Sequence, residues 1–130
     1  MTERKGYNGY KLTDFGQSVL LSKVPPMFRK VFAHHVTHEY NITEALPTIS
    51  STVTVFAVAY NDRVQTAIVE VHGSSVRPDN GTYHITISLD PTVGAKPVDS
   101  NALITNKHSW RMLSEPFTVQ TITAFWPFPN

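Results

Sequence analysis

One tripeptide pattern, histidine followed by an aliphatic residue and threonine, occurs twice in this chain, at His35–Thr37 and at His84–Thr86. Both copies lie in segments whose β-branched and alternating residues predict strands. Because residues i and i+2 of a strand point to the same face, each copy presents one imidazole and one hydroxyl together. The aliphatic residue between them turns toward the core. Two such strands meeting across a cleft would offer two imidazoles and two hydroxyls to one ligand.

Cleavage of a phosphodiester needs this set of groups. A base takes a proton from the attacking oxygen and an acid protonates the leaving oxygen, and the near-neutral pKa of histidine suits both roles. We therefore expect His35 and His84 to be the catalytic pair, with the assignment of acid and base left open. Thr37 and Thr86 would hold the non-bridging oxygens and stabilise the charge of the transition state. Strand propensity alone explains a single copy, so the repetition makes the hypothesis specific.

Further candidates for substrate binding follow the second copy. Gly94 permits close approach of a backbone to a ligand. A helix that begins near Ser100 and Asn101 would direct its first amides at an anion. Lys96 is the nearest charge that could neutralise a phosphate, with a solvated loop position as the alternative. We include Lys96, Ser100 and Asn101 among the expected substrate-binding residues.

Three aromatic residues, Tyr83, Tyr40 and Trp110, are candidates for stacking on a base. Packing in the core or on the surface is the competing role for each of them. Of the three, Tyr83 is included among the expected substrate-binding residues. Arg77 lies in a turn-rich loop, where it would either guard the rim of a cleft or simply be solvated.

Histidines and a carboxylate beside the first copy suggest a metal site. His34, His38 and Glu39 flank His35. In a strand, however, His34 and His38 face away from His35, whereas a zinc site needs converging ligands. We therefore expect no metal and no other cofactor.

On these motifs the chain resembles the two-histidine (2H) phosphoesterase superfamily, whose hallmark is a pair of His-x-Thr/Ser motifs. The closer similarity is to the cyclic phosphodiesterase domain of fungal and plant tRNA ligases and to its stand-alone phage and bacterial relatives. It rests on residues 33–37 and 83–88, on the glycine-led segment 94–104 and on residues 20–26, and it spans residues 7–125. The resemblance implies a bilobal α+β fold of antiparallel sheets with pseudo-twofold symmetry. Each lobe would contribute one motif to a central cleft.

The resemblance also implies an activity. It is the metal-independent opening of a 2′,3′-cyclic phosphate at an RNA end, in which water attacks phosphorus, O3′ leaves and a 2′-phosphate remains. A second possibility keeps the mechanism but changes the substrate to a signalling cyclic oligonucleotide or a 2′–5′ oligoadenylate, as in small viral 2H proteins that blunt host immunity. The lack of an attached RNA-repair domain and the net charge of +1 favour this anti-defence role.

A third possibility is a non-catalytic module that sequesters a nucleotide. Two complete motifs argue against it, since a pure binder has no need of paired proton shuttles. In all three cases the expected partner is a nucleotide or an RNA end, with no required protein partner. A phage or bacterial origin fits the compact domain.

Most of the chain predicts strands, separated by turn residues. They are expected at residues 7–11, 31–38, 52–60, 63–71, 83–89 and 117–125. The first is expected to be a short edge strand, and the two on either side of Asn61 and Asp62 a hairpin. Because strands dominate and helices are few, we expect an α+β fold with antiparallel sheet.

The longer of two expected helices is capped by Thr13 or Asp14. It carries an apolar stripe through Phe15, Val19 and Ser22, which Leu20 and Leu21 widen. It ends at a double proline, which cannot continue a helix.

The second expected helix is short and ends at Ile104, with Asp99 or Ser100 as its cap. One helical turn is expected around Glu44. Residues 1–6 and 126–130 are expected to be irregular tails.

Composition bounds the class of protein. A length of 130 residues and a hydrophobic content of 41% fit a single globular domain over 1–130. The small net charge argues against a protein that coats nucleic acid. The sequence has no cysteine, which excludes disulfides and thiolate zinc sites. A polar start and no apolar run long enough to cross a bilayer predict a protein without a membrane partner. The expected location is cytoplasmic, in the host if the source is viral.

Overall fold

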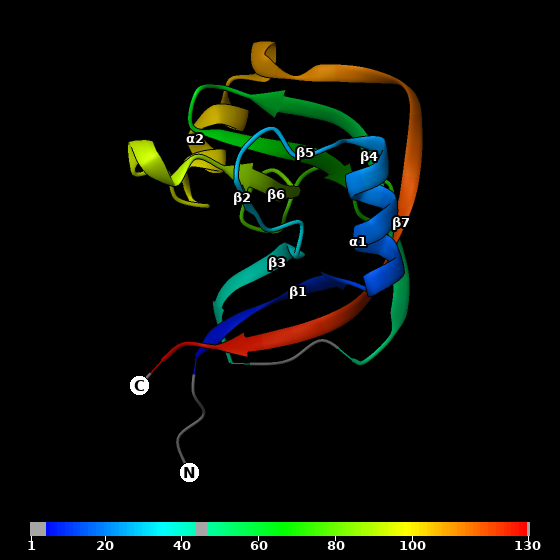
Figure 1. Cartoon of the computed structure of the whole chain (residues 1–130). Coiled ribbons are helices and arrows are strands. Elements are labelled where there is room, and N and C mark those ends of the chain that lie inside the picture. Colours follow the sequence, from blue (N-terminus) through cyan, green and yellow to red (C-terminus); the bar gives the residue numbers. More distant parts are fainter. Residues whose placement is uncertain (1–4, 44–46, 130) are drawn as a thin grey trace.

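A computed structural model of the chain describes residues 5–43 and 47–129 (Figure 1). In these ranges the fold is α+β, with few helices and one curled antiparallel sheet. The elements in chain order are β1 (Gly6–Leu12), α1 (Asp14–Lys23), β2 (Lys30–Val31), β3 (His35–Ile42), β4 (Ser50–Tyr60), β5 (Val64–Glu70), β6 (His84–Leu89), the 3₁₀ turn η1 (Pro91–Val93), α2 (Asp99–Thr105), the 3₁₀ turn η2 (Lys107–Ser109) and β7 (Arg111–Pro127). The longer helix has 10 residues, and no helix of the described ranges could cross a membrane.

The seven strands form one sheet in the order β2-β6-β5-β4-β7-β1-β3. Every pair is antiparallel. The sheet curls, so that β1 and β3 lie in one layer and β4 to β6 in another, with β7 passing between them (Figure 1). Strands β4 and β7 are neighbours in this order. The motif-bearing strand β6 is the third strand on the β4 side, and β3 is the third on the β7 side.

A short crossing segment between β2 and β3 ties one edge of the sheet to the other. The N–H of Ala33 donates to the carbonyl of Thr86 on β6 (2.9 Å), and the carbonyl of His34 accepts from Leu12 on β1 (2.9 Å). The side-chain amide of Gln17 in α1 donates to the carbonyl of Ala33 (3.2 Å). The first motif therefore begins next to the second one, because the chain crosses from β6 to β1 immediately before it.

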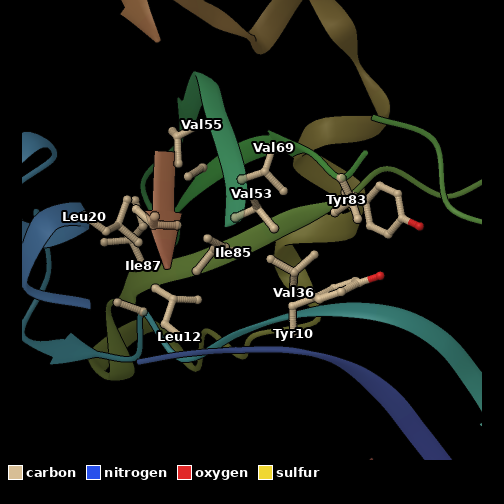
Figure 2. Close-up of a cluster of buried hydrophobic side chains, with 14 residues drawn as sticks. Tyr10, Leu12, Leu20, Val36, Val53, Val55, Val69, Tyr83, Ile85 and Ile87 are labelled. Atoms are coloured by element: carbon tan, nitrogen blue, oxygen red, sulfur yellow. The ribbon is translucent and has the colours of Figure 1, made fainter. Parts of the chain in front are cut away.

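The main apolar core fills the space enclosed by the curl and by α1 (Figure 2). Val36 and Ile85, the middle residues of the two motifs, are fully buried in it. They pack with apolar residues of every long strand and with Leu20 of α1. The expectation that the aliphatic residue of each motif faces the core is confirmed. The histidine and threonine of each motif consequently lie on the other face of their strand.

The structure corrects three strand predictions. Residues 31–38 are not one strand, because Ala33 has a positive φ of 48° and separates β2 from β3. Strand β1 is not at an edge but lies between β7 and β3. The predicted tail from residue 126 is in part regular, since β7 runs to Pro127 and pairs with Gly6. A proline is tolerated there because the strand ends at it.

The helices also differ in detail from the prediction. Thr13 does cap α1, since its hydroxyl accepts from the N–H of Gly16 (3.0 Å). The predicted stripe is confirmed in part: Leu20 is buried, and Val19 and Leu21 pack against the main core. For Phe15 the prediction is wrong, since it is 63% exposed and Gly16 is buried in its place. The predicted caps of α2, Asp99 and Ser100, are wrong, because both lie inside the helix. The residue before α2 is Val98, whose side chain cannot cap it. The turn expected around Glu44 lies outside the described residues.

Gly16 allows α1 to approach the sheet closely. A Cβ at this position would lie 2.2 Å from the carbonyl oxygen of Gln120 on β7. We expect Gly16→Ala to lower the free energy of unfolding by about 1–3 kcal/mol, because the helix must move off the sheet. Urea denaturation would measure it, with the exposed Ser18→Ala in the same helix as the control. Equal stability of Gly16→Ala and Ser18→Ala would contradict the close packing.

Candidate active site

Both motifs open into one cleft with a volume of about 710 Å³. His35 and Thr37 reach it from β3, and His84 and Thr86 from β6. Other residues that line it and bear on its chemistry are Tyr7, His34, Tyr40, Arg77, Val98 and Asn101. The structure therefore brings together the four residues that the sequence predicts to be catalytic.

His84 is fixed by one hydrogen bond of its ring. Its Nδ1 lies 2.8 Å from the carbonyl oxygen of Thr82, so Nδ1 carries the proton and donates it. In the neutral ring Nε2 is then the unprotonated nitrogen. Burial lowers the pKa of His84 and the charge of Arg77 lowers it further, while the bond to Thr82 acts in the opposite direction. The net shift is downward, so His84 is neutral at pH 7 with Nε2 able to accept a proton.

His35 is held by a second imidazole. Its Nδ1 lies 2.9 Å from Nδ1 of His34, so one of these nitrogens donates and the other accepts. The ring of Trp126 packs against His35 with centroids 4.9 Å apart. Burial, His34 and His84 together lower the pKa of His35 to about 4. Like His84, His35 is neutral in the free protein at pH 7.

The position of His34 departs from the sequence-based expectation that it faces away from His35. It precedes β3 rather than belonging to it, and Ala33 with its positive φ turns the chain at this point. The alternation of a strand therefore does not apply to His34, and its ring reaches the cleft. His38, by contrast, does point away, toward Tyr10 and Tyr83.

The two threonines have different surroundings. Oγ1 of Thr86 lies 2.9 Å from Oγ of Ser100, which is fully buried in the first turn of α2. Ser100 thus orients Thr86 rather than lining the cleft itself. Thr37 and Asn101 do line it. The start of α2 is therefore joined to the second motif through a hydroxyl pair.

Besides Ser100, two of the expected substrate-binding residues do not line the cleft, and of the four only Asn101 does. Lys96 is exposed away from the lining, and its N–H donates to the carboxylate of Asp99 (2.9 Å). Tyr83, immediately before β6, is 4% exposed, and its hydroxyl lies 2.6 Å from Nδ1 of His38. Burial is the main cause that raises the pKa of Tyr83 to about 12. Tyr83 thus packs in the main apolar core, whereas His84 lines the cleft.

Of the other two aromatic candidates, Trp110 lies outside the cleft and Tyr40 lines it. Trp110 packs against Phe56 in a second apolar cluster and donates its Nε1–H to the carbonyl of Ile104 (3.0 Å). Tyr40 is 63% exposed and lines the cleft. Tyr40 is thus the one residue of the three that a bound base could contact.

Arg77 supplies the cation that Lys96 does not. Its guanidinium makes two hydrogen bonds to the carboxylate of Asp79, from Nε (3.1 Å) and from Nη2 (3.1 Å). Burial acts to raise the pKa of Asp79, but hydrogen bonds from Gly81 and Arg77 outweigh it and lower the pKa. Both side chains line the cleft. The turn residues after Arg77 predict a loop, but nothing in them predicts that it folds back toward His84.

No family model, no curated protein and no solved structure shows significant similarity to the chain. The chemistry of the cleft is therefore inferred from its own residues. Among the described residues, no group of three or more histidine, aspartate or glutamate side chains is placed to hold a metal ion.

The arrangement is suited to proton transfer on both sides of one bound group. His84 offers an unprotonated Nε2, and His35 can carry a proton on Nε2 while its Nδ1 bonds His34. Two hydroxyls, from Thr37 and Thr86, lie on the same strand faces as the rings. An anion in the cleft would also meet Arg77, whose guanidinium is paired with the carboxylate of Asp79.

Proposed function

We propose that this chain is a metal-independent phosphodiesterase that opens a nucleoside 2′,3′-cyclic phosphate at an RNA end and leaves a 2′-phosphate. The observation that carries the proposal is the meeting of both His-x-Thr motifs in one cleft, each with its aliphatic residue buried behind it. The resemblance to 2H phosphoesterases supports it, because their hallmark is the same pair of motifs. The symmetric places of β3 and β6 about the junction of β4 and β7 support a bilobal arrangement of the 2H kind.

In the proposed reaction His84 is the base and His35 the acid. Nε2 of His84 takes a proton from water, whose oxygen forms a bond to phosphorus as the bond from phosphorus to O3′ breaks. Protonated His35 gives its Nε2 proton to O3′, while its Nδ1–H donates to His34. The proton taken by His84 leaves to solvent and His35 is recharged from solvent, so one water is consumed per bond broken. The bond of His84 Nδ1 to Thr82, which in the neutral ring leaves Nε2 as the acceptor, supports this assignment.

The hydroxyls hold the phosphate between the rings. When Ser100 donates to Oγ1 of Thr86, the proton of Thr86 is directed to a non-bridging oxygen. Thr37 performs the same role from β3. Such preorganised donors stabilise the charge that develops in the transition state.

A second candidate substrate is a cyclic oligonucleotide or a 2′–5′ oligoadenylate, and the size of the cleft favours it. A volume of about 710 Å³ lies in the upper part of the range of small-molecule sites, so it accommodates more than a single cyclic nucleotide. The same two histidines would cleave either linkage. In this case the enzyme would degrade a nucleotide signal rather than process RNA ends.

A substrate panel tests the proposal. The purified protein would be incubated in EDTA with nucleoside 2′,3′-cyclic phosphates, 2′–5′ oligoadenylate and cyclic di- and trinucleotides, and the products identified by mass spectrometry. Conversion of the 2′,3′-cyclic phosphates to 2′-phosphates alone supports RNA-end processing. Cleavage of the oligonucleotides supports the signal-degrading role. Retention of a ligand without any product would contradict both and favour a sequestering module.

We expect EDTA to leave the rate unchanged, because the proposed acid, base and anion-binding groups are all side chains. Rates in EDTA and in buffer treated to remove metals would be compared with rates after addition of Mg²⁺, Mn²⁺ or Zn²⁺. Activity that EDTA abolishes and one of these ions restores would contradict the metal-independent mechanism, while leaving the phosphodiesterase activity itself in place.

A further inference from the structure

Four aromatic rings form a continuous row on the His35 side of the cleft. Tyr7 on β1 lies at the centre, with its ring centroid 5.0 Å from that of Trp126 on β7 and 6.0 Å from that of Tyr40 on β3. Phe128 is the last ring of the row, with its centroid 5.1 Å from that of Tyr40. The Tyr7 ring is stacked with the rings of Trp126 and Tyr40 at interplanar angles of 26° and 24°. We call these four residues the aromatic row.

The row is continuous with the catalytic centre. Trp126 and Tyr7 both lie against the ring of His35, at centroid distances of 4.9 and 5.7 Å. Tyr7 and Tyr40 line the cleft, and Tyr40 is 63% exposed. The row therefore leads from the ring of His35 out to the exposed side chain of Tyr40.

A β-bulge places Tyr40 on the cleft side. Residues Asn8 and Gly9 are adjacent on β1, yet their partners on β3 are Glu39 and Thr37, so His38 is an extra residue. Without the bulge, strict alternation would point Tyr40 and Thr37 to opposite faces. With it, Tyr40 and Thr37 share the cleft, and His38 turns inward to Tyr83. An exposed tyrosine is thus held next to the catalytic strand by a specific distortion of the sheet.

We propose that the aromatic row is a nucleobase-binding subsite, in which a base on the His35 side of the scissile phosphate stacks on Tyr40 and Tyr7. The inference rests on the proposed function and names its substrate class: a nucleotide with an accessible base, a purine in preference to a pyrimidine because its ring surface is larger. Stacking on aromatic side chains contributes about 5- to 150-fold in affinity per base. The phosphate would then lie between the imidazoles, with Arg77 on the far side.

The kinetic test compares a substrate that has a base with one that lacks it. For adenosine 2′,3′-cyclic phosphate, Tyr40→Ala should raise KM about 5- to 150-fold and change kcat little, because stacking is present in both ground and transition states. For methyl riboside 2′,3′-cyclic phosphate, Tyr40→Ala should change neither constant. Tyr40→Trp should restore the KM. Tyr60→Ala is the matched control, since Tyr60 is a half-exposed tyrosine outside the cleft that packs on Arg111.

A binding test separates this subsite from the proposed activity. Calorimetric titration of the wild-type protein with AMP and with ribose 5-phosphate measures the contribution of the base without turnover. Base-dependent binding that Tyr40→Ala abolishes, in a protein that cleaves nothing, would support the subsite and overturn the proposed function. Equal affinity for AMP and ribose 5-phosphate, with active enzyme and an unchanged KM in Tyr40→Ala, would overturn the subsite alone. Dimerisation that Tyr40→Ala abolishes, with nucleotide affinity unchanged, would overturn it in favour of self-association.

Discussion

Alanine in place of His84 or of His35 is expected to lower kcat/KM on the cleaved nucleotide by about 10²- to 10⁴-fold, the usual contribution of a general acid or base. His84→Ala removes the unprotonated Nε2 that is fixed by the Thr82 carbonyl. His35→Ala removes the proton donor for the leaving oxygen. Because both groups act in one step, the double variant should lose less than the sum of the two single losses in free energy of activation. Steady-state rates of the purified variants would measure all three effects.

His108→Ala is the matched control for these variants. His108 is an exposed histidine in η2 and does not line the cleft. Its replacement should leave kcat/KM unchanged. Thermal melts are needed alongside. His35→Ala and His84→Ala should unfold cooperatively, since Val36 and Ile85, rather than the histidines, anchor their strands in the core. Folded His35→Ala and His84→Ala proteins with wild-type rates would end the catalytic assignment.

The parts of the site that depend on local geometry could be predicted from the sequence. The period of two in a strand is enough to put His84 and Thr86 on one face and Ile85 on the other, and the burial of Ile85 agrees with it. The same rule holds for the first motif. Turn residues and the Thr13 cap likewise act within a few positions of themselves, so their local signals are sufficient.

The parts that depend on departures from regular geometry could not be predicted. The positive φ of Ala33 brings His34 to His35, and the bulge at His38 brings Tyr40 to the cleft. Both features break the alternation on which the prediction relied, and neither residue type signals a left-handed turn or a bulge. Arg77 is a tertiary case: its position depends on where a loop folds, which no short-range pattern encodes.

The contribution of Trp126 could not be predicted for a related reason. The sequence Trp-Pro-Phe-Pro argues against regular structure, because proline lacks the N–H that a strand needs. Pairing with Gly6 and Tyr7 nevertheless extends β7 to Pro127. Pairing between β1 and β7 thus outweighs the local preference of the prolines for irregular structure, and it places Trp126 beside Tyr7 in the aromatic row.

The second large effect expected is on the pH dependence of kcat/KM, with the maximum between about pH 4 and 6.5 and a tenfold loss per pH unit above it. The reaction needs one histidine protonated and the other neutral. Burial and neighbouring charges lower the pKa of His35 to about 4 and also lower that of His84. Because the two rings interact, the limbs of the profile belong to the pair rather than to either residue. At pH 8.5 we expect kcat/KM at least about 100-fold below its maximum.

Stability should change with pH in the opposite direction to activity. The unfolded chain binds a proton at His35 near pH 6.5, whereas the folded chain does so only near pH 4. Between these values the unfolded state binds more protons, so the free energy of unfolding falls as the pH drops from 6.5 toward 4, by up to about 3 kcal/mol for this group. Melts across this range would detect the loss. The acid limb of the rate profile should therefore be read together with the folded fraction at each pH.

Removal of the Arg77 charge should move the alkaline limb to higher pH. The guanidinium lowers the pKa of His84, and without it the remaining carboxylate of Asp79 favours the charged imidazole. Arg77→Gln would thus retain more activity at pH 8.5 relative to its own maximum, even if its maximum is reduced by the lost contact to the phosphate. Arg111→Gln is the control, since Arg111 lies over Tyr60 outside the cleft. A profile centred above pH 7 in the wild type, or limbs that coincide in Arg77→Gln and Arg111→Gln, would contradict this account of the histidine pair. A shift confined to Arg77→Gln would instead show that the loop of residues 77–81 sets the working pH of a site whose histidines lie on two other strands.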